Sequence, residues 1–384
     1  MSIDREDLRS LRQRTSAKWR YYPPEVLPAW VAEMDFTLAE PIAAALHAAV
    51  DRSDTGYRWV EGVPEALADF AREQWGWRFD PGTVVVLADV MSSIAQALLH
   101  LTDSGAQVVI NPPIYPPFFS TVDDVCGRTV REVPLAHTDG RYHLDLPGLE
   151  EAFADPRVQA YLLCSPHNPT GTVHTEEELR SVARLAHAND VAVIADEIHA
   201  PMTLVGARHH PFLSVADEWP DLRAVSCVSA SKTWNIPGLK CAQLVATDRL
   251  IEGLRASIPI EATYGVGHFG VVATLAAYRE GGPWWFEMLD VLDARRRQLW
   301  EGLGRCGGVQ MTWPQASYLA WVNLPMLGDD PAAVLLEQGS LAVNSGLAFG
   351  SVGEGHARIN FATSEAILEE IITRVGSIVD AHSS

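Results

Sequence analysis

The sequence has few cysteines, no long apolar run and no excess of positive charge. Its five cysteines are odd in number and show no C-x-x-C spacing, which excludes a disulfide framework and favours buried thiols in a reducing compartment. No apolar stretch approaches the roughly 20 residues that a membrane-spanning helix needs, and residues 1–7 lack the apolar core of a signal peptide. We therefore expect a cytoplasmic protein that does not bind membranes.

The charge balance limits the partners of the chain. The formal net charge is −20, and the acidic residues are spread along the sequence, which argues against nucleic acid or an anionic membrane surface as a partner. The chain has 384 residues and is 47% hydrophobic, so it can bury one large and one smaller core. These totals predict an acidic protein with two packed units.

From about residue 83 the sequence alternates short apolar runs with helical patterns. This rhythm is typical of a mainly parallel sheet covered by helices, so we predict an α/β fold. A helix begins at the capping box Thr175–Glu178 and runs to about residue 189. The clearest strands are 83–88, 107–110, 158–164, 191–195 and 224–229.

After residue 284 the pattern changes to that of a smaller α+β unit. It reads as a long helix, a strand at 318–324, a helix near 331–338, a strand at 357–361 and a terminal helix from residue 364. We find no repeats and no flexible linker, so the units are expected to share an interface with the site between them. The predicted division is an N-terminal segment 1–45 that packs with the small unit, a large unit 46–283 and a small unit 284–384.

Three polar signals close apolar strands of the large unit. They are Ser165–Gly171, Asp196–His199 and Ser229–Lys232. Ligands of open α/β sheets bind outside the carboxyl ends of the strands, so all three signals point to one crevice. Each signal alone is usually a turn or a helix cap, but the ordered set of three predicts a functional site.

The residue types of this set suit pyridoxal 5′-phosphate (PLP). Lys232 follows an apolar strand, where a desolvated amine has a lowered pKa that favours condensation with an aldehyde, so we expect it to carry the cofactor as a Schiff base. Asp196 can supply the carboxylate that keeps the pyridine nitrogen protonated, and Asn168 can donate to the ring oxygen.

The phosphate group of such a cofactor needs its own contacts. Ser229 and Lys240 offer a hydroxyl and a positive charge, and the turn 89–92 opens a helix whose free amides suit an anion. The further residues expected to contact the cofactor are Val90, Met91, Ser92, His199 and Ser231.

Two other patterns are set aside. Residues 265–270 match the dinucleotide fingerprint but follow no apolar strand, so we assign no nucleotide site. The pair His209–His210 and His199 lack neighbours at metal-ligand spacing, so we expect no metal.

The ordered motifs resemble those of fold-type I PLP enzymes, the aspartate aminotransferase superfamily. More specifically, the chain resembles the cystathionine β-lyase subgroup typified by MalY and PatB, within the class I/II aminotransferase family. The resemblance covers nearly the whole chain. The matching segments are 18–19, 27–36, 56–57, 113–118, 164–171, 196–199, 231–239 and 349–360.

This resemblance implies roles for further residues. Tyr115 should act in catalysis and stack on the cofactor ring, and Tyr57 should reach the cofactor phosphate of a neighbouring subunit, which implies a homodimer with shared active sites. Arg358 should hold the substrate carboxylate through two parallel hydrogen bonds, with Asp35 and Asn168 as further substrate contacts.

One segment departs from the subgroup. Residues 89–93, Asp-Val-Met-Ser-Ser, stand where the subgroup has a Pro-Gly-Val-Val-like phosphate turn.

The activity implied by the resemblance is β-elimination from an S-substituted L-cysteine. A thiol, pyruvate and ammonia would be released. Two alternatives stay open: transamination or decarboxylation-linked deamination of a related amino acid by the same residues, and a regulatory binding protein that contacts a transcription factor.

Overall fold

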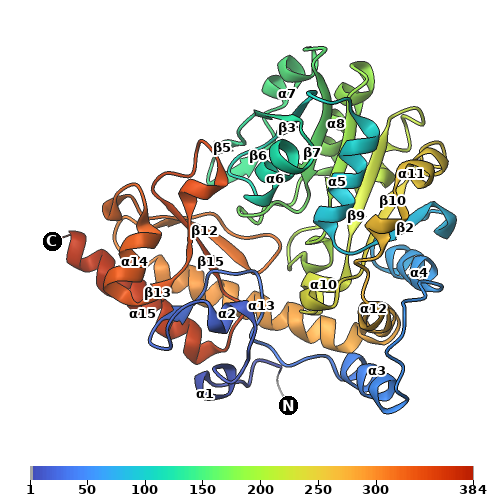
Figure 1. Ribbon diagram of the computed structural model, residues 1–384. Helices are drawn as coiled ribbons and strands as arrows, with labels where there is room; N and C mark the ends of the chain where they lie inside the picture. Colours follow the sequence, from blue (N-terminus) through green and yellow to red (C-terminus); the bar gives the residue numbers. More distant parts are fainter. Residues whose placement is uncertain (1–2, 384) are drawn as a thin grey trace.

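The larger lobe of the protein is built on a seven-stranded sheet (Figure 1). The structure is a computed structural model that describes residues 3–383. The strand order is β2-β10-β9-β8-β7-β3-β4, and β10 alone runs antiparallel to its neighbours. The strands are β2 Val84–Leu87, β3 Gln107–Ile110, β4 Thr129–Glu132, β7 Val158–Cys164, β8 Ala192–Asp196, β9 Ala224–Val228 and β10 Ala242–Ala246.

Helices cover both faces of this sheet because its central strands are apolar on both sides. Val108 packs with the helix α5 (Val90–Leu101) on one face, whereas Val109 packs with α7 (Leu146–Phe153), α8 (Glu176–Ala188) and α9 (Phe212–Ala216) on the other. The helices of this lobe are α3 Glu40–Asp51, α4 Val63–Trp75, α5 Val90–Leu101, α6 Pro117–Ser120, α7 Leu146–Phe153, α8 Glu176–Ala188, α9 Phe212–Ala216, α10 Ala230–Thr233, α11 Ile251–Ser257 and α12 His268–Glu280. A hairpin of β5 Ala136–Thr138 and β6 Arg141–His143 extends from it.

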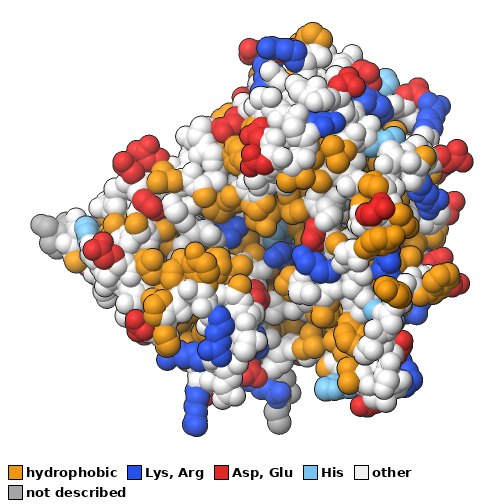
Figure 2. Space-filling view, in the orientation of Figure 1, with side chains coloured by type: hydrophobic (Ala, Val, Ile, Leu, Met, Phe, Trp, Pro, Cys, Tyr) orange, Lys and Arg blue, Asp and Glu red, His pale blue; other side chains and the backbone are white. Residues whose placement is uncertain are grey.

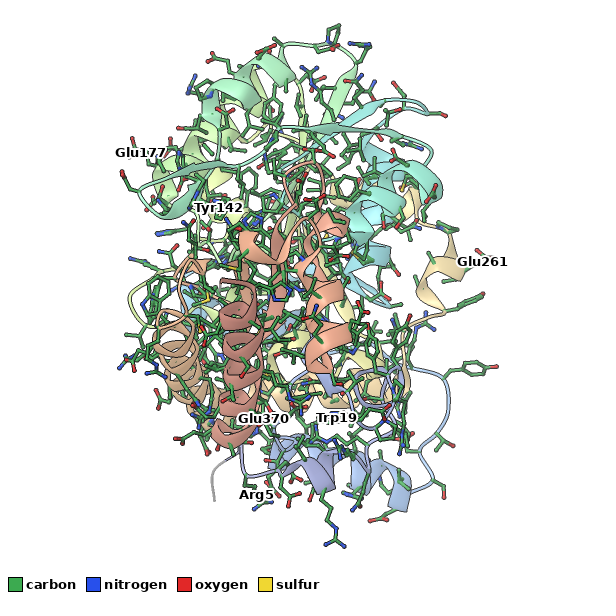
Figure 3. The ribbon with its side chains drawn as sticks, turned by 90° about the vertical axis from the view of Figure 1, so that its left-hand side faces the viewer. Arg5, Trp19, Tyr142, Glu177, Glu261 and Glu370 are labelled. Carbon is green, nitrogen blue, oxygen red and sulfur yellow. The ribbon has the colours of Figure 1, made fainter. Side chains whose placement is uncertain are left out.

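The C-terminal part forms a second lobe around a four-stranded antiparallel sheet, in the order β11-β12-β15-β14. Its long helices face the viewer in Figure 3. Its elements are α13 Gly282–Leu303, β11 Gln310–Met311, β12 Leu319–Asn323, α14 Pro331–Gly339, β13 Leu341–Ala342, β14 Asn344–Ser345, β15 His356–Asn360 and α15 Glu365–Ser383.

The N-terminal segment joins this second lobe. It contains α1 Leu8–Leu11, α2 Ala17–Arg20 and β1 Leu27–Pro28, and β1 pairs in parallel with β13. The division into 1–45, 46–283 and 284–384 remains a proposal, and residues 1, 2 and 384 lie outside the described part.

The predicted fold class is confirmed, and most strands match. The ranges 107–110 and 158–164 coincide with β3 and β7, and the capping box of Thr175 and Glu178 is present. Two strands of the seven-stranded sheet were missed. The strand β4 is a polar edge strand, and β10 carries Gln243 in its centre, so neither shows a continuous apolar run. Within residues 3–383, no helix is both long and apolar enough to cross a membrane.

Candidate active site

A cavity of about 190 Å³ lies beyond the carboxyl ends of β8 and β9. Figure 2 shows a hollow between the two lobes, with lysine or arginine side chains at its edge. The cavity brings together most of the residues predicted from the three motifs. The predicted residues that line it are Val90, Met91, Tyr115, Asn168, Asp196, His199, Ser231, Lys232 and Lys240.

Lys232 lies on α10, directly after β9, because the strand ends where the sequence turns from apolar residues to Ser-Ala-Ser. Its Nζ donates a hydrogen bond of 2.8 Å to the carbonyl oxygen of Ala32. Burial lowers the pKa of Lys232 to about 8, and the nearby Arg358 adds to this effect. A substantial fraction of this amine is therefore neutral near pH 8 and able to act as a nucleophile or a base.

Asp196 is the last residue of β8 and is buried. Its Oδ1 accepts a hydrogen bond of 3.1 Å from the backbone N–H of Ile198. Burial raises the pKa of Asp196 to about 7, although this hydrogen bond and Lys232 favour its ionised form. Such a carboxyl can share a proton with a basic ring nitrogen.

His199 lies close to this carboxyl in the chain and is buried beside Tyr318. Burial lowers its pKa to about 3, so the imidazole is neutral. Tyr115 lies in the wall of the same cavity. Burial raises the pKa of its phenol, which therefore stays protonated. Both rings therefore offer neutral, planar surfaces to a ligand in the cavity.

Arg358 extends from β15 and is buried, with 4% of its surface exposed. Its Nη1 donates to Asn168 Oδ1 at 3.0 Å, and its Nη2 donates to Asn344 Oδ1 at 2.5 Å and to the Trp30 carbonyl at 3.1 Å. Burial lowers the pKa of Arg358 to about 10.

No carboxylate within the described residues forms an ion pair with Arg358, since all its hydrogen-bond partners there are neutral oxygens. A buried cation without a counter-ion is costly, so this guanidinium is poised for an anionic ligand.

The first turn of α5 holds the residues predicted to bind phosphate. Asp89 caps this helix, and its Oδ1 accepts from the backbone N–H and the hydroxyl of Ser92, both at 2.8 Å. Its Oδ2 pairs with Lys240 Nζ at 2.9 Å. Burial raises the pKa of Asp89, but the hydrogen bonds from Lys240 and Ser92 outweigh burial and hold it below its usual value. The Asp89 carboxylate therefore already accepts the hydrogen bonds that a phosphate group would accept at this helix N-terminus.

Some predicted residues lie outside the cavity wall. Ser229 is buried behind it, where its hydroxyl donates to the Cys241 carbonyl at 2.8 Å and accepts from the Ser231 N–H at 3.1 Å. Tyr57 is fully exposed on this chain. Ser92 lies in the first turn of α5, where its backbone N–H and its hydroxyl donate to the cap residue Asp89.

The structure does not bring Asp35 to the cavity. Its carboxylate forms a buried ion pair of 2.8 Å with Lys18 and accepts a hydrogen bond of 3.2 Å from Trp19 Nε1. This ion pair therefore holds the N-terminal segment in place. In that segment, the Trp30 carbonyl accepts a hydrogen bond from Arg358, and the Ala32 carbonyl accepts one from Lys232.

Sequence reasoning missed several residues of the site. Ala32, Ile198 and Pro237 line the cavity, and Tyr318 donates its hydroxyl to the Ala32 carbonyl at 3.0 Å. The apolar residues carry no chemical signal, and Ala32 reaches the site only because its segment crosses from the other lobe.

The cavity fits PLP. It offers an amine with a lowered pKa on Lys232, a buried carboxyl on Asp196 and, beside the N-terminus of α5, the ammonium group of Lys240. Fold and site together define a PLP-dependent enzyme. Residues 33–375 match the family described as aminotransferase class I and II, and the chain belongs to this family.

Individual relatives confirm the resemblance to the PatB subgroup. The chain is 42% identical to a Mycobacterium leprae protein named "Putative cystathionine beta-lyase", over 97% of both chains. It is 33% identical to the cystathionine beta-lyase PatB of Bacillus subtilis, over 98% of this chain and 99% of the relative.

A solved structure shows the same fold. It is a Corynebacterium diphtheriae protein described as a "putative plp-dependent beta-cystathionase", which superposes with a TM-score of 0.92 at 31% identity over 99% of both chains.

Proposed function

We propose that the protein is a PLP-dependent carbon–sulfur β-lyase that acts on an S-substituted L-cysteine and releases a thiol, pyruvate and ammonia. Relatives named as cystathionine beta-lyases support the reaction class. The observation that carries the assignment of an amino acid as substrate is the buried Arg358, which has no carboxylate partner among residues 3–383 and is hydrogen-bonded to Asn168 of the cavity wall.

Substrate binding is assigned to Arg358 and Asn168. The two guanidinium nitrogens, Nη1 and Nη2, now contact neutral oxygens, and a substrate carboxylate would satisfy the positive charge better through charge-assisted hydrogen bonds. Asn168 holds the guanidinium plane through its Oδ1, so it orients Arg358 as well as lining the cavity.

Proton transfer is assigned to Lys232. When bound, PLP binds amines covalently at its aldehyde and withdraws electrons from the carbon that loses its proton. Lys232 holds the cofactor before the substrate arrives and then, as a neutral amine, takes the proton from the substrate Cα. The pKa of about 8 makes this neutral form accessible near physiological pH.

Asp196 and Tyr115 are assigned to the cofactor ring. The Asp196 carboxylate would hold a proton at the pyridine nitrogen, and the positive charge of the protonated ring would favour the ionised carboxylate against the effect of burial. The Tyr115 ring lies in the cavity wall, where it would pack against the ring of the bound cofactor. Val90, Met91, Ser92, Ser229, Ser231, Lys240 and His199 are the proposed contacts around the rest of the cofactor.

Product analysis tests the proposed reaction. The holoenzyme with L-cystathionine should produce free thiol and pyruvate in equal amounts, and the Lys232→Ala protein should produce neither. A keto acid that keeps the sulfur substituent would instead show transamination, and carbon dioxide would show decarboxylation; either product without thiol contradicts the lyase proposal. A panel of S-alkyl and S-glycosyl cysteines would then define the leaving group.

The first prediction concerns Arg358. Replacing it with lysine keeps the charge but removes the planar pair of donors, so KM for the substrate should rise roughly 10- to 100-fold, with a smaller change in kcat. Steady-state kinetics measure both. Arg157→Lys, at an exposed ion pair with Asp155, is the matched control and should change neither value. An unchanged KM in Arg358→Lys would place the substrate carboxylate elsewhere.

The second prediction concerns Asp89. Its carboxylate neutralises Lys240 and adds negative charge at the α5 N-terminus, so Asp89→Asn should keep the helix cap and tighten PLP binding roughly 3- to 10-fold. Equilibrium titration of the cofactor-free protein, followed by absorbance, measures the Kd. Asp145→Asn at the cap of α7 is the control. Weaker binding in Asp89→Asn would show that the carboxylate supports the cofactor.

We infer that the protein is a homodimer with shared active sites. Four large side chains are exposed on neighbouring segments of this chain, which is unusual for a surface that faces only water. The two segments are 57–59 and 260–264, and a hydrogen bond of 2.5 Å from Arg58 Nη2 to Thr263 Oγ1 links them. Figure 3 shows the segment that carries Glu261 standing out from the body. The four side chains are Tyr57, Trp59, Ile260 and Tyr264.

The third prediction tests this dimer. Tyr57→Ala and Lys232→Ala should each be inactive alone, and mixing them with subunit exchange should restore up to about one quarter of native activity. Half of the dimers are then mixed, and each of these has one site with both native residues. Activity assays and analytical ultracentrifugation check the result. No recovery despite demonstrated exchange would show that the sites are not shared.

A further inference from the structure

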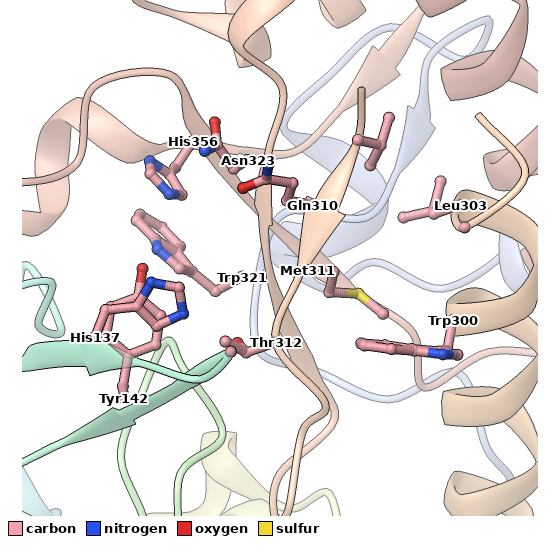
Figure 4. A pocket seen from close by; sticks show the side chains of 13 residues that line it. His137, Tyr142, Trp300, Leu303, Gln310, Met311, Thr312, Trp321, Asn323 and His356 are labelled. Atoms are coloured by element: carbon pink, nitrogen blue, oxygen red, sulfur yellow. The ribbon is translucent and has the colours of Figure 1, made fainter. Parts of the chain in front are cut away.

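A second cavity, of about 480 Å³, lies outside the site of Lys232 and shares no lining residue with it. The hairpin β5–β6, the strands β11 and β12 and the end of α13 surround it (Figure 4). Its volume lies within the roughly 300–1,000 Å³ that is typical of small-molecule sites. None of the functions assigned above uses it.

Aromatic and imidazole rings dominate one side of this cavity. Trp321 and His356 stack with ring centroids 4.9 Å apart and an angle of 9° between their planes. His137 and Tyr142 stack at 4.4 Å and 22°. Figure 4 shows these four rings along one side and Trp300 on the other. Such a surface favours planar ligands, because a flat aromatic ring can stack on it in an offset arrangement.

A hydroxyl group belongs to this ring surface. The Trp321 side chain is 2% exposed, its Nε1 has almost no accessible surface, and its N–H lies against the Tyr142 hydroxyl. Tyr142 is half-buried, and its hydroxyl can donate a hydrogen bond as well as accept one. The site therefore suits a ligand with an acceptor atom.

The remaining polar groups are uncharged. The Nδ1 of His356 lies 2.8 Å from the Glu354 carbonyl oxygen and must carry the proton, which leaves its Nε2 as an acceptor. Gln310 and Asn323 add amide groups. Among the described residues, no Asp, Glu, Lys or Arg lines the cavity, so a charged ligand would lose its hydration without gaining a counter-ion.

We propose that this cavity is a binding site for a neutral, planar heteroaromatic molecule, which stacks on the rings and accepts a hydrogen bond from the Tyr142 hydroxyl. The proposal is independent of the lyase reaction, because it uses none of the residues assigned to it.

The position of the site links it to substrate binding. Trp321 and Arg358 are direct partners on β12 and β15 and so lie on the same face of the sheet. The Phe349 ring lies 5.1 Å from the Trp321 ring and 5.1 Å from the Arg358 guanidinium. A bound ligand would therefore be separated by one aromatic ring from the group proposed to hold the substrate carboxylate.

Titration of the holoenzyme with adenine, a neutral heteroaromatic ring with several acceptor atoms, tests the proposal by calorimetry. We expect saturable binding that is weakened roughly 3- to 10-fold in His137→Ala and in Tyr142→Phe, as expected for the loss of one stacked ring or one hydrogen bond. His143→Ala is the matched control: alternate side chains of β6 point to opposite faces, so it should bind adenine like the native protein. Benzoate, a charged ring, should bind more weakly than adenine.

Three results would overturn the proposal. They are the absence of saturable adenine binding, equal binding in His137→Ala, Tyr142→Phe and the native protein, and displacement of adenine by L-cystathionine in Lys232→Ala, which would place the ring in the lyase site. Circular dichroism of each variant shows that a lost affinity is not lost folding. His137 is exposed, so its replacement leaves the core intact.

Discussion

Replacement of Lys232 by alanine should reduce thiol release at least about 1,000-fold while the fold is retained. The variant loses both the amine that holds PLP and the base for the Cα proton, and a positioned base alone contributes roughly 100- to 10,000-fold. In the described part of the chain, the Nζ has one hydrogen-bond partner, the Ala32 carbonyl, so its loss removes few contacts. Single-turnover assays measure the activity, and circular dichroism measures the fold.

Chemical trapping identifies the attachment point independently of activity. The chain has only three lysines, Lys18, Lys232 and Lys240, so every attachment by a side-chain amine can be distinguished. Borohydride reduction of the holoenzyme followed by peptide mapping should place the cofactor on Lys232. Lys18 is held in a buried ion pair with Asp35 and should stay unmodified. Cofactor found on Lys240 or Lys18 would refute the assignment.

The second large effect is expected at Asp196. In Asp196→Ala the pyridine nitrogen loses the carboxyl that holds its proton, so kcat should fall roughly 100- to 10,000-fold. The cofactor should still bind, because Lys232 and Lys240 are unchanged. Absorbance of the bound cofactor and steady-state kinetics separate the two effects. An Asp196→Ala enzyme with native kcat would show that protonation of the ring is not required.

The raised pKa of Asp196 also predicts how pH affects the cofactor-free protein. The folded state binds this proton more tightly than the unfolded state, so the associated stability is present below about pH 4 and is lost as pH rises through about 7. The loss is roughly 4 kcal/mol in the free energy of unfolding. Between pH 5 and 8, the native protein should therefore lose more stability than Asp196→Asn in denaturant titrations. Parallel curves for the two proteins would contradict the shift.

The sequence alone was sufficient for the fold class and for the centre of the site. Apolar strands followed by polar motifs are local patterns, and the carboxyl ends of parallel strands meet at one edge of a sheet. Lys232, Asp196 and Asn168 therefore converge as predicted. The capping box at Thr175 was equally local and was also confirmed.

Only the tertiary structure decided which long-range partners each group has. Asp35 was expected near the substrate, but its partner Lys18 lies in a helix of the N-terminal segment. Asp89 reaches Lys240 across 151 positions of the chain, and the carbonyl of Ala32 meets Lys232 across 200. The stacked rings of Trp321 and His356 come from two strands that pair only in the folded sheet. Periodicity and motifs describe a residue and its neighbours in the sequence, whereas burial, pKa and ion pairing depend on contacts that form only when separate segments pack together.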